Sequence, residues 1–261
     1  MQTSIPKCQA CSKIDVFVSR NPGSGCTCVI YQEKALEHIK HLVNEADLGT
    51  SLVSALKLTE SEHYGEYLIT TRDKEIETHA IHVIRYLFGG TKLRCWEYLD
   101  VGCGTFLPTL QIAKELGSYP FGIDYADRRK CSHDVQYFEL APIDKVCYGN
   151  SQFKFVMMCD ILHHHPNPEE LVIASLGGLT DRGCLMIMDH DCESWEDSYY
   201  LELLHLVYAK TTGPGNYLPT YGYRRRNYWR EFMKVRGYGV VYEEACQIYR
   251  GYVDVYQKSF Q

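Results

Sequence analysis

Residues 97–106, EYLDVGCGTF, decide the fold of this chain. They form an apolar strand pattern that ends in Asp100, followed by a glycine-rich turn that opens a helix. Glycine lets a ligand approach the backbone closely, and the first turn of a helix offers free N–H groups. A second strand pattern, YPFGID (119–124), ends in Asp124, which suits the hydroxyl pair of a ribose. The pattern therefore predicts a nucleotide-binding α/β sheet.

The turn lacks the third glycine of the dinucleotide fingerprint, and Leu107-Pro108 follows instead. A nicotinamide dehydrogenase is therefore disfavoured. Strand and helix patterns alternate from Cys95 onward, which predicts a parallel sheet covered on both faces. The predicted strands are 96–101, 120–124, 135–140, 153–158, 184–188, 239–243 and 252–260. The predicted helices are 31–46, 73–88 (ending at Gly89-Gly90), 107–116, 169–178, 195–210 and 225–236.

Composition limits the class of protein. The chain has 261 residues with 45% hydrophobic and 23% charged residues, enough for one large domain, or for one domain with a small appendage. We expect a Cys-rich extension over 1–50 and the main domain over 51–261. The sequence shows no apolar run long enough for a membrane span and no secretory signal at its start. Twelve scattered cysteines favour a reducing compartment, so we expect a soluble, cytoplasmic protein that does not bind membranes.

Four blocks follow one another in register between about residues 95 and 192: DVGCGT, GIDY, FVMMCDILHHHPNP and GCLMIMDHD. Together they resemble the class I S-adenosylmethionine-dependent methyltransferases. The resemblance implies a Rossmann-like α/β fold with a seven-stranded, mostly parallel sheet and S-adenosylmethionine as the cofactor. One departure is Lys154, where related sequences often have Asp.

The resemblance also implies a cofactor site, residue by residue. Asp100, Gly102, Cys103 and Gly104 would line the amino-acid end of the cofactor, and Asp124 would bind the ribose. The remaining implied positions are Tyr125 by the adenine, Glu139 or Asp144 near its amine, and Asp160 with Ile161 beside the methyl donor.

The methyl acceptor decides whether a base is needed. An oxygen or carbon nucleophile needs one, whereas a ring nitrogen with a free lone pair does not. Within His163-His164-His165, His164 is the candidate base, and the alternative is that the run simply ends a strand. The Lys-Asp-Lys-Glu set of RNA 2′-O-methyltransferases fits poorly, because only Lys210 and Glu243 accompany Asp160.

The C-terminal part contains DHDC (189–192), LLHLVY (203–208) and YRRRNYW (223–229). These blocks resemble, more loosely, small viral methyltransferases, above all a nidovirus enzyme that methylates the RNA cap at guanine N7. Residues 220–236 carry five Arg and one Lys against one Glu, although the whole chain has a net charge of −6. Arginines interleaved with aromatic side chains can bind phosphates and stack on a base. The implied substrate-binding residues are Asp189, His190, Asp191, His205, Tyr208, Tyr223, Arg224 and Trp229.

Capped RNA, or another phosphate-bearing substrate, is therefore the expected partner, with viral replication proteins as further partners in a host cytoplasm. Three alternatives stay open. The aromatic and basic residues could form ordinary packing and a solvated helix face. The LHHHPNP run also resembles quinone and sterol methyltransferases, which act on small molecules. Finally, the chain could be a cofactor-binding subunit without catalysis.

The N-terminal segment has cysteines at CxxC and CxC spacing: Cys8, Cys11, Cys26 and Cys28. Thiolates at such spacing can hold a structural Zn²⁺, and His38 or His41 could replace one of them. The alternative is a small Cys-containing lid without metal.

Overall fold

The computed structural model gives side-chain detail for six stretches and for Leu201 and His205. The stretches are 72–89, 91–93, 97–125, 152–194, 220–246 and 251–259. Backbone alone is described for 17–19, 27–29, 64–71 and 138–140. Contacts divide the chain into a first unit, Met1–Thr70 with Cys192–Arg224, and a second unit, Thr71–Asp191 with Arg225–Gln261. In the described part of the chain, no helix combines the length and the apolarity that crossing a membrane requires.

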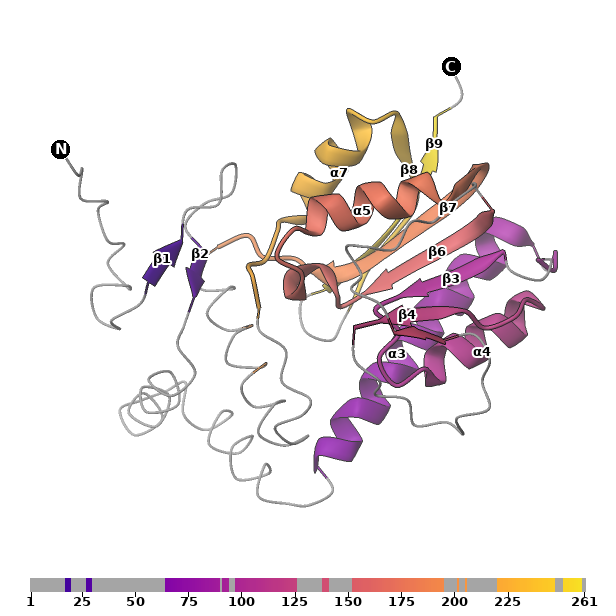
Figure 1. Ribbon diagram of the computed structural model, residues 1–261, viewed down its shortest axis with the longest axis horizontal. Coiled ribbons are helices and arrows are strands. Elements are labelled where there is room, and N and C mark those ends of the chain that lie inside the picture. Colours follow the sequence, from indigo (N-terminus) through magenta and orange to yellow (C-terminus); the bar gives the residue numbers. More distant parts are fainter. Residues whose placement is uncertain are drawn as a thin grey trace. The chain divides into compact units, whose positions relative to one another are not determined.

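In the first unit, two short strands, β1 (Phe17–Ser19) and β2 (Thr27–Val29), pair in antiparallel fashion. The second unit contains a sheet with the strand order β5-β4-β3-β6-β7-β9-β8 (Figure 1). Its strands are β3 (Tyr98–Val101), β4 (Gly122–Asp124), β5 (Phe138–Leu140), β6 (Phe153–Cys159), β7 (Leu179–His190), β8 (Tyr238–Ala245) and β9 (Gly251–Lys258). The helices are α3 (Tyr64–Phe88), which starts in the first unit, α4 (Leu107–Leu116), η2 (Leu162–His164), α5 (Pro168–Gly177) and α7 (Arg226–Lys234).

The strands β5, β4, β3, β6 and β7 are parallel, and β9 runs antiparallel between β7 and β8. The central strand β3 pairs with β4 on one side and with β6 on the other. The strand order therefore reverses at β3: β4 and β5 are added on one side of it, and β6 and β7 on the other. Ligands of open α/β sheets bind at such a reversal, beyond the carboxyl ends of the strands.

Two hydrophobic clusters cover the two faces of the sheet, as the alternation of side chains along a strand requires. Ile76, Ile112 and Phe155 belong to the cluster under α3 and α4. Leu171 and Trp229 belong to the cluster under α5 and α7, on the opposite face (Figure 1). The predicted α/β sheet with helices on both faces is confirmed.

The boundaries differ from the predictions where local apolar periodicity is weak. Helix 107–116 was predicted with the bounds that α4 has. Strand β7 begins five residues before the predicted 184–188, because its first half includes the exposed Asp181 and Arg182 and has no apolar run.

Lys154, where related sequences often have Asp, forms an ion pair at the start of β6: its Nζ lies 2.9 Å from Glu97 Oε1.

Several predictions lie outside the described residues. Helix 31–46 is one, and of helix 195–210 only residues 201 and 205 are described, both helical. The domain boundary predicted at residue 50 falls within 30–63, so it stays a prediction.

Candidate functional site

The glycine-rich turn between β3 and α4 has two glycines in the left-handed region. Gly102 has φ +80° and Gly104 has φ +51°. At Gly102 an added Cβ would lie 2.7 Å from Cγ1 of Ile161, so this glycine is needed for packing against the end of β6. At Gly104 an added Cβ would meet nothing within 4 Å. The turn therefore leaves open space at Gly104, where a ligand can reach the backbone.

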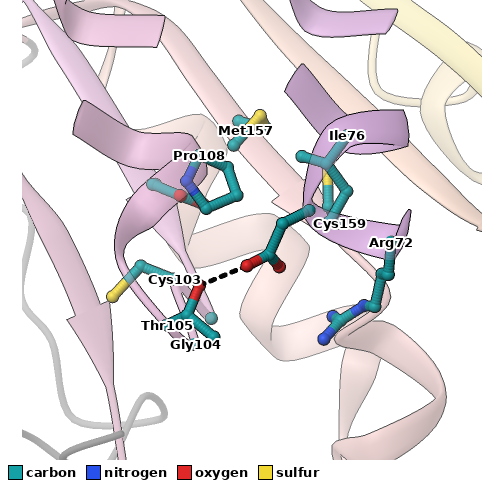
Figure 2. A pocket seen from close by; sticks show the side chains of 11 residues that line it. Arg72, Ile76, Cys103, Gly104, Thr105, Pro108, Met157 and Cys159 are labelled. Atoms are coloured by element: carbon teal, nitrogen blue, oxygen red, sulfur yellow. Dashed lines mark hydrogen bonds between the residues drawn. The ribbon is translucent and has the colours of Figure 1, made fainter. Parts of the chain in front are cut away.

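Two buried carboxylates flank this turn. Asp124, at the end of β4, is 0% exposed, and its Oδ2 accepts a hydrogen bond of 2.9 Å from the Gly104 N–H. Asp100 accepts a 2.6 Å hydrogen bond from the Thr109 hydroxyl. Burial, with a contribution from the charge of Asp124, raises the pKa of Asp100 to about 7. The implied cofactor residues Asp100, Gly102, Cys103 and Gly104 line one pocket (Figure 2).

The other wall of the pocket comes from α3, which the sequence did not connect with the site. Arg72 Nε donates to Asp160 Oδ2 at 3.0 Å, and the Thr105 hydroxyl donates to Asp73 Oδ2 at 2.8 Å. Arg72 and Asp73 both line the pocket (Figure 2). The one sequence feature that could have pointed to α3 as part of the site was the adjacent Arg72 and Asp73 at the start of the predicted helix 73–88. Nothing in the sequence indicated their partners.

Asp160 follows β6 and has a positive φ of 49°, which is uncommon outside glycine. Burial works to raise the pKa of its carboxyl. The Arg72 guanidinium, with smaller effects of His190 and His163, holds that pKa below its ordinary value. The Asp160 carboxylate, directly after β6, is therefore charged at neutral pH and pairs with Arg72.

A buried His–Asp pair joins the carboxyl ends of β6 and β7. The Nδ1 atom of His163 lies 2.6 Å from Oδ1 of Asp189, and the two residues are 2% and 4% exposed. The His190 N–H donates to the same oxygen at 2.7 Å, and burial raises the pKa of Asp189 to about 7. His164, the predicted candidate base, is half-buried, with its ring centre 4.1 Å from that of His163. Of the two histidines, it is His163 that this carboxylate orients.

None of the implied substrate residues that the structure describes is exposed. Trp229, implied to bind the substrate, is 1% exposed and packs in the core under α7, as in the alternative of ordinary packing. Asp191 accepts a 2.9 Å hydrogen bond from the N–H of Arg226, in the first turn of α7. Tyr223 and Arg224 are buried residues of the first unit. There, Tyr223 Oη lies 3.1 Å from Nδ1 of His205, which also contacts the Leu201 carbonyl at 2.7 Å.

Two arginines of the basic segment are already paired. Arg226 and Arg230 both donate to Asp254, a 0% exposed carboxylate on β9, and both also contact Glu243. A phosphate site in this segment would therefore not use the side chains of Arg226 and Arg230.

Some of the predicted site residues are not among those whose side chains the structure describes. Tyr208, Asp144 and the cysteines 8, 11 and 26 are not among the described residues, and Glu139 and Cys28 are described by backbone only, in β5 and β2. Tyr125, implied to lie by the adenine, is 43% exposed directly after β4.

No known family model matches the sequence, and no curated protein does. Solved structures do match. A Burkholderia thailandensis 1,6-didemethyltoxoflavin-N1-methyltransferase with bound S-adenosylhomocysteine aligns over 94% of this chain and 95% of its own, with 13% identity and a TM-score of 0.56. This chain has the class I methyltransferase fold.

Two further structures agree. One comes from the complex between the Haloferax volcanii Trm112 methyltransferase activator and a methyltransferase, with a TM-score of 0.55, 11% identity and coverage of 77% and 95%. The other is the mitomycin 7-O-methyltransferase, with a TM-score of 0.52, 12% identity and coverage of 86% and 67%. At these identities the likeness establishes the fold alone.

The raised pKa of Asp100 predicts a pH dependence of stability. The native carboxyl titrates at about 7, whereas its ordinary value is 3.8, so between these values the folded protein holds a proton that the unfolded chain has released. The contribution of Asp100 to the free energy of unfolding is therefore expected to fall as pH rises from about 4 to about 7.

Asp100→Asn should flatten this fall, because asparagine keeps an acceptor for Thr109 and carries no proton to lose. Asp189 contributes to the pH dependence that remains in the variant, since its pKa is also raised to about 7. Urea unfolding from pH 5 to pH 8 measures the effect, and equal slopes for wild type and variant would contradict it.

Proposed function

We propose that this protein transfers a methyl group from S-adenosylmethionine to an acceptor. The observation that carries the proposal is the pocket at the carboxyl end of β3. This pocket is lined by the open glycine position Gly104 and by Arg72 and Asp73 of α3, and it lies where the strand order of a methyltransferase fold reverses. The buried Asp124, at the end of β4, contacts the Gly104 N–H beside it.

The chemistry of the pocket fits this cofactor. Gly104 leaves room beside the backbone, where the amino-acid end of the cofactor would lie. Arg72 and Asp73 present opposite charges there, which suits a group that carries both a carboxylate and an ammonium. Asp124 would accept from the ribose hydroxyls. When bound, the cofactor supplies an activated methyl group on a sulfonium, and the protein contributes orientation and exclusion of water.

For the acceptor, we propose the guanine N7 of an RNA cap, on the strength of the resemblance of the C-terminal blocks to viral cap enzymes. A ring nitrogen needs no base, so positioning can supply the catalysis. The exposed Arg225 remains available for phosphate after Arg226 and Arg230 are assigned to Asp254.

The second candidate is a small aromatic acceptor. Two structural neighbours are named for small molecules, one methylated on nitrogen and one on oxygen. Because Arg226 and Arg230 are already paired with Asp254, they also favour an acceptor with fewer phosphates than an RNA cap.

The test is transfer of radiolabelled methyl from S-adenosylmethionine to short RNAs capped with unmethylated GpppA or GpppG. Label that requires the cap, and that disappears when N7 is already methylated, is the expected result. Cofactor binding by calorimetry with no label on any RNA would move the acceptor to a small molecule. Binding without turnover on either class would indicate a non-catalytic subunit, and no cofactor binding would overturn the whole proposal.

His164→Ala distinguishes the two kinds of acceptor chemistry. With a ring-nitrogen acceptor, kcat should stay close to wild type, because no proton has to be removed. If His164 were a general base for an oxygen acceptor, kcat would fall by about 100-fold to 10,000-fold. Measured kcat with saturating substrate decides, and a large loss on capped RNA would contradict an orientation-only mechanism.

The N-terminal zinc site also stays a proposal, with Cys8, Cys11, Cys26 and Cys28 as ligands. The test compares metal content: the wild-type protein should hold about one zinc per chain more than a Cys8→Ser/Cys11→Ser variant.

A further inference from the structure

A cluster of three potential metal ligands lies between α3 and the end of β8. Glu75 and His79 are four residues apart on α3, and Cys246 directly follows β8. One ligand atom from each lies within 4.8 Å of the other two. All three residues belong to the second unit. Side chains four apart on a helix share one face, so α3 offers two ligands together.

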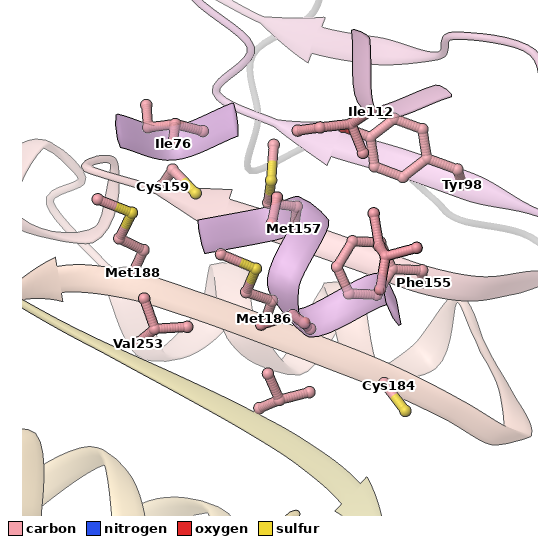
Figure 3. Close-up of a cluster of buried hydrophobic side chains, with 14 of the residues drawn as sticks. Ile76, Tyr98, Ile112, Phe155, Met157, Cys159, Cys184, Met186, Met188 and Val253 are labelled. Atoms are coloured by element: carbon pink, nitrogen blue, oxygen red, sulfur yellow. The ribbon is translucent and has the colours of Figure 1, made fainter. Parts of the chain in front are cut away.

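The backbone fixes the third ligand. The Cys246 N–H, directly after β8, donates at 2.9 Å to the carbonyl of Gly251, the first residue of β9. On the helix side, Ile76 and Ala80 bury the neighbouring face of α3 in the hydrophobic cluster (Figure 3 shows Ile76 with Met157 and Met188). The helix α3 and the end of β8, which carry the three ligands, are therefore both fixed by packing or backbone hydrogen bonds.

A carboxylate orients the histidine. Nδ1 of His79 lies 3.0 Å from Oε2 of Glu244, and the Tyr242 hydroxyl donates to the same oxygen at 2.8 Å. Nε2 of His79, on the other edge of the ring, lies 3.8 Å from Oε1 of Glu75. Histidines that bind metal typically donate their second N–H to a carboxylate, which fixes the tautomer with the other nitrogen toward the ion.

The environment favours a cation. Glu75 and His79 have side chains only 9% and 12% exposed, and Cys246 is 6% exposed. Two carboxylates and a thiol thus surround one imidazole in a mostly buried position. Sulfur, nitrogen and oxygen ligands together match zinc better than the oxygen-preferring Mg²⁺ or Ca²⁺.

We propose that Glu75, His79 and Cys246 bind a Zn²⁺ ion, with Glu244 orienting His79 and the fourth position open to water or a further ligand. This site differs in residues from the N-terminal cysteine site and does not depend on the proposed methyl transfer. A bound ion would also restrain a residue of the pocket. Arg72 lies three residues before Glu75, so an ion that ties α3 to β8 also holds Arg72 in the pocket beside Asp160.

The experiment uses full-length protein carrying Cys8→Ser and Cys11→Ser, purified with zinc and dialysed, with metal content measured by mass spectrometry. About one zinc per chain is expected. Added His79→Gln or Cys246→Ser should remove it, whereas His82→Gln, at an exposed position on the same helix, and Cys192→Ser, at a thiol outside the cluster, should keep it. Zinc near zero in the parent protein, or zinc retained after both ligand substitutions, would overturn the site.

Cobalt substitution keeps the test decisive if a ligand variant fails to fold. In the otherwise native Cys8→Ser/Cys11→Ser protein, Co²⁺ should give tetrahedral visible absorption and a charge-transfer band with the intensity of one thiolate. No such spectrum, or a band with the intensity of several thiolates, would refute the proposed ligand set.

Discussion

Asp254→Ala is expected to lower the free energy of unfolding by about 3–5 kcal/mol, the usual cost of removing one partner from a buried ion pair. The carboxylate is 0% exposed and accepts from two guanidinium groups, with Arg226 Nε at 3.0 Å and Arg230 Nε at 2.8 Å. The Tyr256 hydroxyl donates to it as well, at 3.1 Å. Without Asp254, the two half-buried guanidinium groups would keep Glu243 as their ion-pair partner among the described residues.

Thermal unfolding measures this effect. At about 2–4 °C per kcal/mol for a domain of this size, the Tm should fall by roughly 6–20 °C. Glu243→Gln is the matched control, because the Glu243 side chain is 59% exposed and exposed pairs contribute about 1 kcal/mol or less. A Tm loss no larger than that of the control would show that Asp254 does not hold α7 on the sheet.

Asp124→Asn is expected to weaken binding of S-adenosylmethionine by about 100-fold or more. Each hydrogen bond to a charged group contributes about 1.5–3 kcal/mol, and a ribose diol would donate two. Asparagine keeps one acceptor oxygen for the Gly104 N–H, which Asp124 now binds at 2.9 Å, so the turn should stay formed. The loss would then come from the ligand and not from the fold.

Titration calorimetry of wild type and variant gives the affinity, and Asp181→Asn serves as the control, since the Asp181 side chain is 92% exposed on β7. An unchanged Tm beside the lost affinity would locate the effect in the pocket. Affinity close to wild type would remove the ribose role from Asp124.

The two expected effects differ in how far the sequence could foresee them. Asp124 was predicted, because it ends a short apolar strand and follows the glycine-rich turn at a spacing that the methyltransferase resemblance explains. Asp254 was not. It lies within the apolar pattern of strand 252–260, and nothing in that pattern indicates that two arginines of α7 reach it.

The aromatic and basic segment shows why a sequence pattern cannot separate binding residues from core residues. Trp229 lies in a stretch rich in Arg and Tyr, which suggested a surface for a base, yet it packs in the core beside Met233. A nine-residue helix over the sheet must bury one face, and in a helix the residues four apart share it. The arginines on the same helix then neutralise a carboxylate on the neighbouring strand.

The sequence by itself determined the local features of this protein: the order of strands and helices, the glycine-rich turn and the acids that end β3 and β4. Those features depend on hydrophobic period and on the conformational freedom of glycine, and both can be recognised in a few consecutive residues. Only the tertiary structure decided the partners of charged groups: Arg72 with Asp160, Arg226 and Arg230 with Asp254, and Glu75 and His79 with Cys246. These pairs join positions that are far apart in the chain. They meet because β9 inserts between β7 and β8 and because α3 packs across the sheet, and electrostatic pairing of that kind has no period in the sequence.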